Sequence, residues 1–306
     1  MSVQDILKAV GSIEKPVFFA GSHKNSGKTT AMMALVEALR GEGRLCSLFT
    51  TGRDGESTDA IFGNEKPRVR VEAGELFVTS SRGLSGMRPA VIRWTAETAA
   101  GGMDRLGIFR AHESGCVEMH GPRDAAGVWR IIHSLEHLAP QRPLLVDGSL
   151  DRWAALGRCE AGVVLVIGAH SFGTPAKAAS FLSQRLNAMG LPVESNIQFD
   201  LGASFSGEEE IRGLTVLFRG AATEELLGAI FEREPQMVVV PSPMHLFVSE
   251  GFFSRHQDKL GLLGSPHILG IAVNLFHVRD KAPGEYAKAL RAVAGEIPLA
   301  DFLLCE

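Results

Sequence analysis

The chain is poor in cysteine and in long apolar runs. Its four cysteines lie far apart among 306 residues, with no Cys-x-x-Cys pair, so neither a disulfide framework nor a zinc finger is expected. The longest apolar run, from Ala161 to Ala169, is about half the length of a membrane-spanning helix. The first residues lack the uninterrupted apolar stretch of a signal peptide. We expect a soluble, cytoplasmic protein.

The chain also lacks an excess of charge and is sparse in aromatic residues. Lys and Arg number 31 against 35 Asp and Glu, which leaves a net charge of −4. This balance excludes a basic surface for nucleic acid and a long acidic or disordered tail, so we expect no nucleic-acid or membrane partner. Apolar residues make up 45% of the chain, enough for a core, while 34 glycines and only 7% aromatic residues favour an alternating α/β fold.

Apolar runs alternate with helical patterns along most of the chain. The run Pro16–Ala20, a glycine-rich turn, the helical stretch Thr29–Leu39 and the run Leu45–Thr50 predict a strand–helix–strand unit. The continuous runs Leu144–Val146 and Val163–Ile167 are typical of strands buried on both faces of a parallel sheet. We therefore predict an α/β fold with a mostly parallel sheet flanked by helices.

The segment 67–120 breaks this alternation and predicts an insert rich in β-hairpins. Short strands are expected there at Arg68–Val71, Leu76–Thr79, Leu106–Arg110 and Val117–His120. Elsewhere we expect helices at Gln4–Val10, Ala125–Leu138, Pro175–Asn187, Thr223–Phe231 and Glu285–Ala294, and strands at Thr215–Phe218, Met237–Val240 and Ile268–Val273. A polar break at Gly202–Glu210 suggests a core over residues 1–204 and a C-terminal α/β part over 205–306, either separate or continuous with the core.

The turn between the first strand and helix carries the strongest chemical signal. It predicts a P-loop, in which backbone N–H groups and the start of the helix bind phosphate. Lys28 would reach the β- and γ-phosphate oxygens, and the Thr29 hydroxyl would coordinate Mg²⁺. The usual first glycine is replaced by Ser22, and a chance surface turn is the alternative. The expected binding residues are Gly21, Ser22, Asn25, Ser26, Gly27, Lys28, Thr29 and Thr30.

Polar side chains follow three other predicted strands. Asp147 comes directly after an apolar strand and is expected to hold the shell of Mg²⁺, with a simple strand-end cap as the alternative. Asp54 or Glu56 follows the second strand, which by chain order should lie beside the first, near the γ-phosphate. Either carboxylate would contact the metal or orient the attacking water, with Arg53 neutralising charge, unless the segment is a solvated turn. Asn274 ends a late strand and would bind the nucleotide base or form a turn.

A second pattern, His133-Ser-Leu-Glu136-His137, matches the His-x-x-Glu-His arrangement of some zinc proteases. On a helical wheel both histidines point away from the apolar side formed by Val128, Ile131 and Leu135. A catalytic zinc needs its ligands turned into the protein. We therefore interpret this segment as the solvated face of a helix.

The phosphate-loop residues resemble the dethiobiotin synthetase and cobyrinate a,c-diamide synthase group of P-loop proteins. The resemblance rests on Gly21-x5-Gly27-Lys28-Thr29, on Asp147-Gly148-Ser149 and on the apolar strand Gly162–Gly168. In this group a late strand ending in Asn helps to bind adenine, which implies that role for Asn274. However, the segment Arg44–Gly52 lacks the substrate-binding Lys-Pro of dethiobiotin synthetases, and His23 occupies the position of the signature lysine of ParA-like ATPases.

Several weaker motifs, in order from about residue 17 to 276, are similar to the ATP-binding reactivase subunit of adenosylcobalamin-dependent lysine 5,6-aminomutase. They are Gly52–Glu56, Glu65-Lys-Pro with Gly74-x-Leu76, His120-Gly-Pro122, Val146–Arg152, Gly220–Leu226 and Val273-Asn274. This resemblance implies an ATP- and Mg²⁺-dependent helper that lets damaged cobalamin leave a mutase, together with a second subunit. An ATP-dependent small-molecule ligase or kinase of the synthetase type is the alternative, with Arg53 or Arg152 holding the acceptor carboxylate. The sequence leaves the oligomeric state open.

Overall fold

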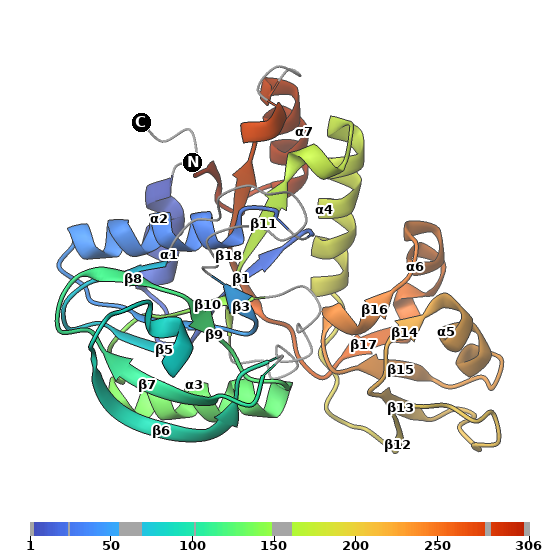
Figure 1. The fold of residues 1–306 in the computed structure, drawn as a ribbon. Coiled ribbons are helices and arrows are strands. Elements are labelled where there is room, and N and C mark those ends of the chain that lie inside the picture. Colours follow the sequence, from blue (N-terminus) through green and yellow to red (C-terminus); the bar gives the residue numbers. More distant parts are fainter. Residues whose placement is uncertain are drawn as a thin grey trace. The chain divides into compact units, whose positions relative to one another are not determined.

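The computed structural model describes residues 3–23, 25–54, 69–100, 102–148, 161–278 and 283–302, with the backbone alone at Arg53, Asp54 and His277. The described residues form two compact units (Figure 1). The first takes in the described parts of Met1–Ala155, Ala161–Ala179 and Ile268–Glu306, and the second is Ser180–His267. Among the described residues, no helix is long and apolar enough to cross a lipid bilayer.

The first unit is built on a mixed, mostly parallel sheet, which confirms the predicted fold class. Among the described residues its strand order is β19-β18-β11-β1-β10-β2-β5-β7-β6. β1 pairs in parallel with β10 and β11, and the parallel arrangement continues through β2 to β5, after which β7 and β6 are antiparallel. The bounds are β1 (Val17–Gly21), β2 (Ser47–Thr50), β5 (Leu76–Ser80), β6 (Ala90–Thr98), β7 (Arg105–Arg110), β10 (Leu144–Gly148), β11 (Gly162–Gly168), β18 (His267–Asn274) and β19 (Leu299–Asp301).

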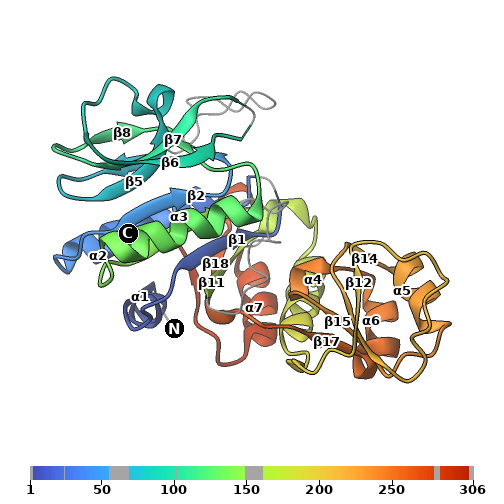
Figure 2. The same ribbon diagram turned by 90° about the horizontal axis from the view of Figure 1, so that it is seen from below.

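Helices cover both faces of this sheet because neighbouring residues of a strand point to opposite sides. Phe19 belongs to the core cluster that contains the buried side of α2, whereas the ring of Phe18 packs against Trp129 of α3 at 6.4 Å. Figure 2 shows α3, in green, lying along the sheet. The helices of this unit are α1 (Val3–Gly11), α2 (Lys28–Gly41), α3 (Ala125–Leu138), α4 (Pro175–Met189, which extends into the second unit) and α7 (Pro283–Ala294).

Local sequence explains where α2 and α3 begin and end. α2 buries Ala31, Met32, Leu35, Val36 and Leu39, which recur at helical spacing. It ends where Gly43 adopts a left-handed backbone with φ 75°, a conformation that glycine adopts without strain. α3 begins at the cap residue Asp124, whose carboxylate accepts the N–H of Gly127 at 2.7 Å.

The strand order corrects the expectation that β2 lies beside β1. β10 occupies that place: it pairs with β1 through Phe19↔Asp147 and with β2 through Asp147↔Thr50. Chain order fails here because the insert and α3 follow β2, and the chain then returns between the two strands it has already formed. Asp147 therefore lies on the strand next to β1, and the segment after β2 starts one strand further away.

The predicted hairpin-rich insert is confirmed, with differences in detail. β4 (Val69–Val71) pairs antiparallel with β8 (Gly115–Val117), and β3 (Arg53–Asp54) pairs antiparallel with β9 (Met119–His120). The predicted strand Val117–His120 is thus two short strands. β6 was not expected, and its register shifts at Val91/Arg93 and Trp94/Thr98 explain why no clean alternation reveals it.

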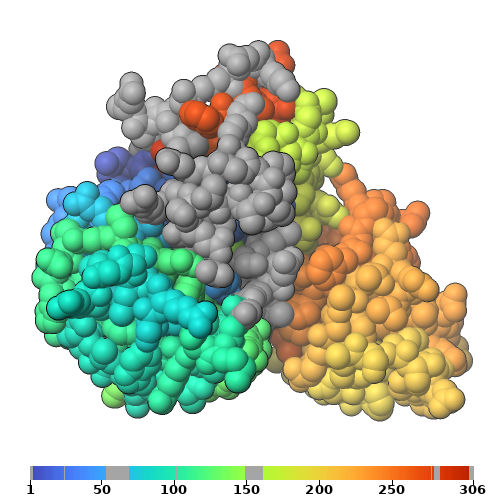
Figure 3. Space-filling model, in the orientation of Figure 1, coloured from blue at the N-terminus to red at the C-terminus, as the bar shows by residue number. Residues whose placement is uncertain are grey.

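The second unit has its own parallel sheet, in the order β12-β13-β15-β17. Its residues, yellow to orange in Figure 3, enclose a separate apolar cluster that includes Val216, Ile230 and Val238. The elements are β12 (Phe199–Gly202), β13 (Thr215–Phe218), β14 (Ala222–Thr223), α5 (Glu224–Phe231), β15 (Met237–Val240), β16 (Leu246–Phe247), α6 (Glu250–His256) and β17 (Leu260–Leu262). This division differs from the one expected near residue 204, because the polar break there is the connection from β12 to β13, and β18, α7 and β19 return to the first unit.

Candidate functional site

The loop between β1 and α2 has the backbone of an anion-binding turn. Asn25 and Gly27 both adopt left-handed conformations, with φ 62° and 97°. Such residues in a tight turn direct successive N–H groups to one side, where they can bind an anion. Gly27 is also the residue before α2, and no side chain caps the helix there. The first N–H groups of α2 are therefore left for backbone, solvent or ligand partners.

Close packing inside the loop explains two of its small residues. A Cβ at Gly21 would lie 2.2 Å from the Ser26 hydroxyl and 2.8 Å from the Lys28 side chain, so a larger residue there would have to displace these side chains. The aliphatic part of Lys28 thus lies against the start of the loop. Ser26 is fully buried, and among the described residues its Oγ has no hydrogen-bond partner. Thr30 follows in the first turn of α2.

Two residues predicted to hold magnesium lie together. The Thr29 hydroxyl donates to Oδ2 of Asp147 at 2.5 Å, although the two residues are 118 positions apart in the sequence. Asp147 is fully buried near the end of β10, and Thr29 is the second residue of α2. A hydroxyl and a carboxylate oxygen are ligands that suit Mg²⁺. These atoms are thus positioned to hold the ion directly or through its water shell.

The segment after β2 is tied to the same carboxylate-bearing strand through the backbone. The Thr51 N–H donates to the Asp147 carbonyl at 2.9 Å, and the hydroxyl of Thr50 donates to the same oxygen at 3.2 Å. β3 follows at once, so the backbone of Asp54 lies in a short strand rather than in a free turn. Glu56 and Arg152 lie outside the described residues, and contact of the Asp54 carboxylate with a metal stays a prediction.

Ser22 and His23 attach the front of the loop to the end of β11. The Ser22 N–H donates to the Val166 carbonyl at 2.8 Å, and its hydroxyl accepts the Gly168 N–H at 3.2 Å. Ser22 is not among the left-handed residues of the described chain, which explains why glycine is not required at this position. The serine hydroxyl therefore supplies a contact that the more usual glycine lacks.

His23 stands where ParA-like proteins have a lysine, but its side chain is an uncharged anchor. Its Nδ1 lies 2.7 Å from the Ser22 hydroxyl, and its Nε2 lies beside the Ser171 hydroxyl and 3.4 Å from Nε2 of His170. Burial, the neighbouring His170 imidazole and the Lys28 ammonium lower the pKa of His23 to about 4. At neutral pH this side chain therefore cannot provide the cation that a signature lysine supplies.

Asn274 contacts the loop itself. Its amide Nδ2 donates to the Ser26 carbonyl at 3.3 Å, and its Oδ1 accepts the Phe276 N–H at 3.1 Å. A Cβ on Gly27 would lie 2.8 Å from the same Nδ2. The end of β18 is thus bonded to the loop between β1 and α2. Asn274 also forms the strand-end turn that was the alternative expected from the sequence. A role in binding the base stays a prediction.

The His133–His137 segment lies on the outside of α3, as the helical wheel predicts. Both histidines are exposed, while Val128, Ile131 and Leu135 are buried on the other side. His133 Nδ1 lies 3.3 Å from a carboxylate oxygen of Glu136, one turn away on the same exposed face. The segment is therefore a solvated helix face, as interpreted from the sequence.

One polar group at this edge of the sheet escaped the sequence analysis. His120, in β9, is 7% exposed and lies between Ser80 at the end of β5 and Glu118. The motif His120-Gly-Pro122 appeared only as a point of resemblance. A histidine followed by glycine and proline was a signal in the sequence. Its partner Ser80 lies 40 residues earlier, and no sequence pattern indicated that contact.

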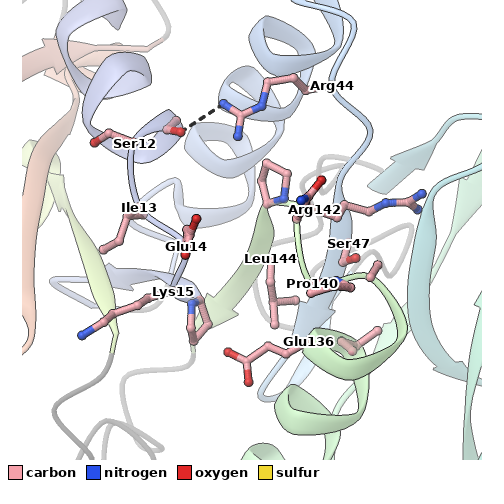
Figure 4. A pocket seen from close by; sticks show the side chains of 16 residues that line it. Ser12, Ile13, Glu14, Lys15, Arg44, Ser47, Glu136, Pro140, Arg142 and Leu144 are labelled. Carbon is pink, nitrogen blue, oxygen red and sulfur yellow. Dashed lines mark hydrogen bonds between the residues drawn. The ribbon is translucent and has the colours of Figure 1, made fainter.

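A cavity of about 300 Å³ lies at the amino ends of the central parallel strands (Figure 4). It is lined by the turn that precedes β1, by the start of β2 and β10, and by the end of α3, with Glu14, Arg44, Ser47, Glu136 and Leu144 among its residues. Arg44 is occupied there by a hydrogen bond of 3.4 Å to the Gly11 carbonyl. Because the loop between β1 and α2 follows the carboxyl end of β1, this cavity is distinct from the candidate phosphate site.

Comparison of the chain with protein-family models, with curated proteins and with solved structures finds no match.

Proposed function

We propose that this protein binds and hydrolyses ATP with Mg²⁺ at the loop between β1 and α2. The contact between the Thr29 hydroxyl and the Asp147 carboxylate, at 2.5 Å beside a left-handed loop, is the observation that carries the proposal. The loop also offers hydrogen-bond donors that suit a phosphate group. The buried Ser26 hydroxyl has no partner among the described residues, and the start of α2 has no side-chain cap.

Each residue would have a defined task in that site. The N–H groups of the loop and of the first turn of α2 would hold phosphate oxygens, and the partial positive charge of the helix would favour them. Lys28 would neutralise negative charge that develops during transfer. Thr29 and Asp147 would hold the metal. Bound Mg²⁺ would supply charge neutralisation and orientation of the phosphate groups.

We further propose that hydrolysis is coupled to remodelling of a protein partner, namely reactivation of a cobalamin-dependent aminomutase by cofactor exchange. The order of the motifs that resemble those of reactivase subunits supports this assignment, and so does the uncharged His23, which does not suit an exchanged-lysine dimer. The insert supplies a surface for such a partner. Its edge strand β6 has the exposed side chains Val91, Arg93 and Trp94.

ATP hydrolysis by the purified protein tests the proposal, measured alone and with an aminomutase inactivated by bound hydroxocobalamin, together with any candidate second subunit. We expect slow hydrolysis alone, and faster hydrolysis with recovery of mutase activity when the target is present. Lys28→Ala should abolish both activities. Hydrolysis that does not respond to the mutase would contradict the reactivase assignment, and the test would turn to small carboxylates as ATP-dependent acceptors.

A further inference from the structure

We propose that His120 is a positioning residue, and that its imidazole fixes the segment Gly52–Asp54 against the insert so that events at the insert reach the nucleotide site. The inference rests on the proposed function, because it concerns the rate of ATP hydrolysis at that site. We call Glu118–Gly121, the segment that includes β9, the β9 latch.

The latch lies directly on the segment that follows β2. His120 pairs with Arg53 and Met119 with Asp54 across the antiparallel strands β9 and β3. The Gly121 N–H donates to the Gly52 carbonyl at 2.5 Å. The contact leaves no space, because a Cβ on Gly121 would lie 2.1 Å from the Thr50 carbonyl oxygen. The backbone position of Asp54 therefore depends on where the latch lies.

The imidazole of His120 joins the latch to the insert. Its Nε2 is 2.9 Å from a carboxylate oxygen of Glu118, and its Nδ1 is 2.8 Å from the hydroxyl of Ser80. A carboxylate can only accept, so Nε2 carries the proton and donates it. In the neutral ring Nδ1 is then the acceptor, and the Ser80 hydroxyl donates to it. This arrangement orients the ring from both sides.

The partners of His120 are themselves held by the insert. The Glu118 N–H donates to the Gly83 carbonyl at 2.8 Å, and the Thr79 hydroxyl donates to the Glu118 carbonyl at 2.6 Å. A Cβ on Gly83 would lie 2.2 Å from that carbonyl oxygen. β5 and the short 3₁₀ helix that follows it, Ser81–Leu84, therefore fix Glu118, and through it the latch.

The order hydroxyl, imidazole, carboxylate also occurs in hydrolases that use a serine nucleophile. That role does not apply here, because Ser80 is fully buried and a substrate cannot reach its hydroxyl. His120 is likewise only 7% exposed. The chain of hydrogen bonds therefore acts on the position of the backbone and not on a substrate atom.

The latch has a short connection to the candidate metal site. Two residues come directly before the segment Gly52–Asp54: the Thr50 hydroxyl and the Thr51 N–H both donate to the carbonyl of Asp147. A partner that displaces β9 would move this segment relative to Asp147. A partner bound to the insert would thus stimulate hydrolysis through β5, the latch and the end of β2.

His120→Gln tests this role. The amide N–H of glutamine can still donate to Glu118, but glutamine has no acceptor at the position of Nδ1, which accepts from Ser80. We expect the kcat of ATP hydrolysis to fall about 10- to 100-fold, as displaced catalytic groups do, with KM and Mg–ADP affinity within about twofold of wild type. Ser80→Ala should lower kcat in the same direction, and the double variant should lose less than the product of the two effects. His133→Gln, at an exposed histidine that also contacts a glutamate, is the matched control.

A second readout does not depend on activity. Amide hydrogen exchange at Gly121, whose N–H bonds Gly52, should become faster in His120→Gln and stay unchanged in His133→Gln. Unchanged exchange and unchanged kcat in His120→Gln and Ser80→Ala would overturn the inference, and so would an equal loss of Mg–ADP binding. If the wild type neither binds nor hydrolyses ATP, but exchange at Gly121 becomes faster in His120→Gln, the proposed function is wrong and the structural role of His120 in the latch is supported.

Discussion

Replacement of Asp147 by Asn separates a metal-holding carboxylate from a strand-end cap. Asp147 is fully buried, and its Oδ2 accepts the Thr29 hydroxyl at 2.5 Å. An amide oxygen in the same place can accept the same hydrogen bond, while the buried negative charge is removed. The free energy of unfolding of the ligand-free Asp147→Asn protein is measured first, because it is the reference against which the effect of ligand is read.

The part of the stability that depends on added ligand reports on the metal site. At a Mg–ADP concentration of about 100 times the wild-type Kd, binding should stabilise the native protein by about 2.7 kcal/mol. Loss of a residue that holds or orients a metal weakens binding about 10- to 100-fold, which leaves about 1.4 to 0.4 kcal/mol at the same ligand concentration. Chemical denaturation with and without Mg–ADP measures this difference. If Asp147→Asn keeps the wild-type stabilisation by Mg–ADP, the assignment of this carboxylate to the metal is refuted.

Three further predictions concern the loop and its support. Gly27→Ala should lower the free energy of unfolding by about 1–3 kcal/mol, since φ is 97° and a Cβ would meet the Asn274 amide at 2.8 Å, whereas Gly43→Ala, with φ 75° and open space, should cost about 1 kcal/mol by denaturant titration. Glu75→Ala should cost about 3–5 kcal/mol in the same assay, because the fully buried Glu75 accepts two hydrogen bonds from Arg40; a cost under 1 kcal/mol would contradict this. His23 has its pKa lowered to about 4, so its contribution to stability is complete above pH 6.5 and is lost as the pH falls toward 4; stability measured against pH should show this loss in wild type and a smaller one in His23→Gln.

The parts of the site that could be predicted are those that depend on residues close together in the sequence. A strand, a glycine-containing turn and a helix that begins at Lys28 are local features, and an apolar strand that ends in Asp147 is another. The sheet brings Thr29 and Asp147 together because β1 and β10 are neighbours, with Phe19 opposite Asp147. The proximity of Thr29 and Asp147 could therefore be predicted without knowledge of the full strand order.

Features that depend on the strand order or on distant partners could not be predicted. β10 lies between β1 and β2 because the chain returns to the middle of the sheet, and no local pattern records that return. β6 is hidden because it buries no residue fully and its register shifts twice, so its sequence shows no regular apolar alternation. The contact of Asn274 with the Ser26 carbonyl joins residues 248 positions apart, so its support of the loop emerges only from the fold.

Calorimetric titration of the wild-type protein and of Lys28→Ala with a non-hydrolysable ATP analogue and Mg²⁺ tests the phosphate site most directly. We predict binding of one analogue per chain by the wild type, weakened when Mg²⁺ is removed by EDTA and weakened at least about tenfold in Lys28→Ala, since a positioned ammonium is lost from the phosphate groups. No binding by the wild type, or equal binding by the two proteins, would contradict the assignment of this loop to nucleotide phosphate.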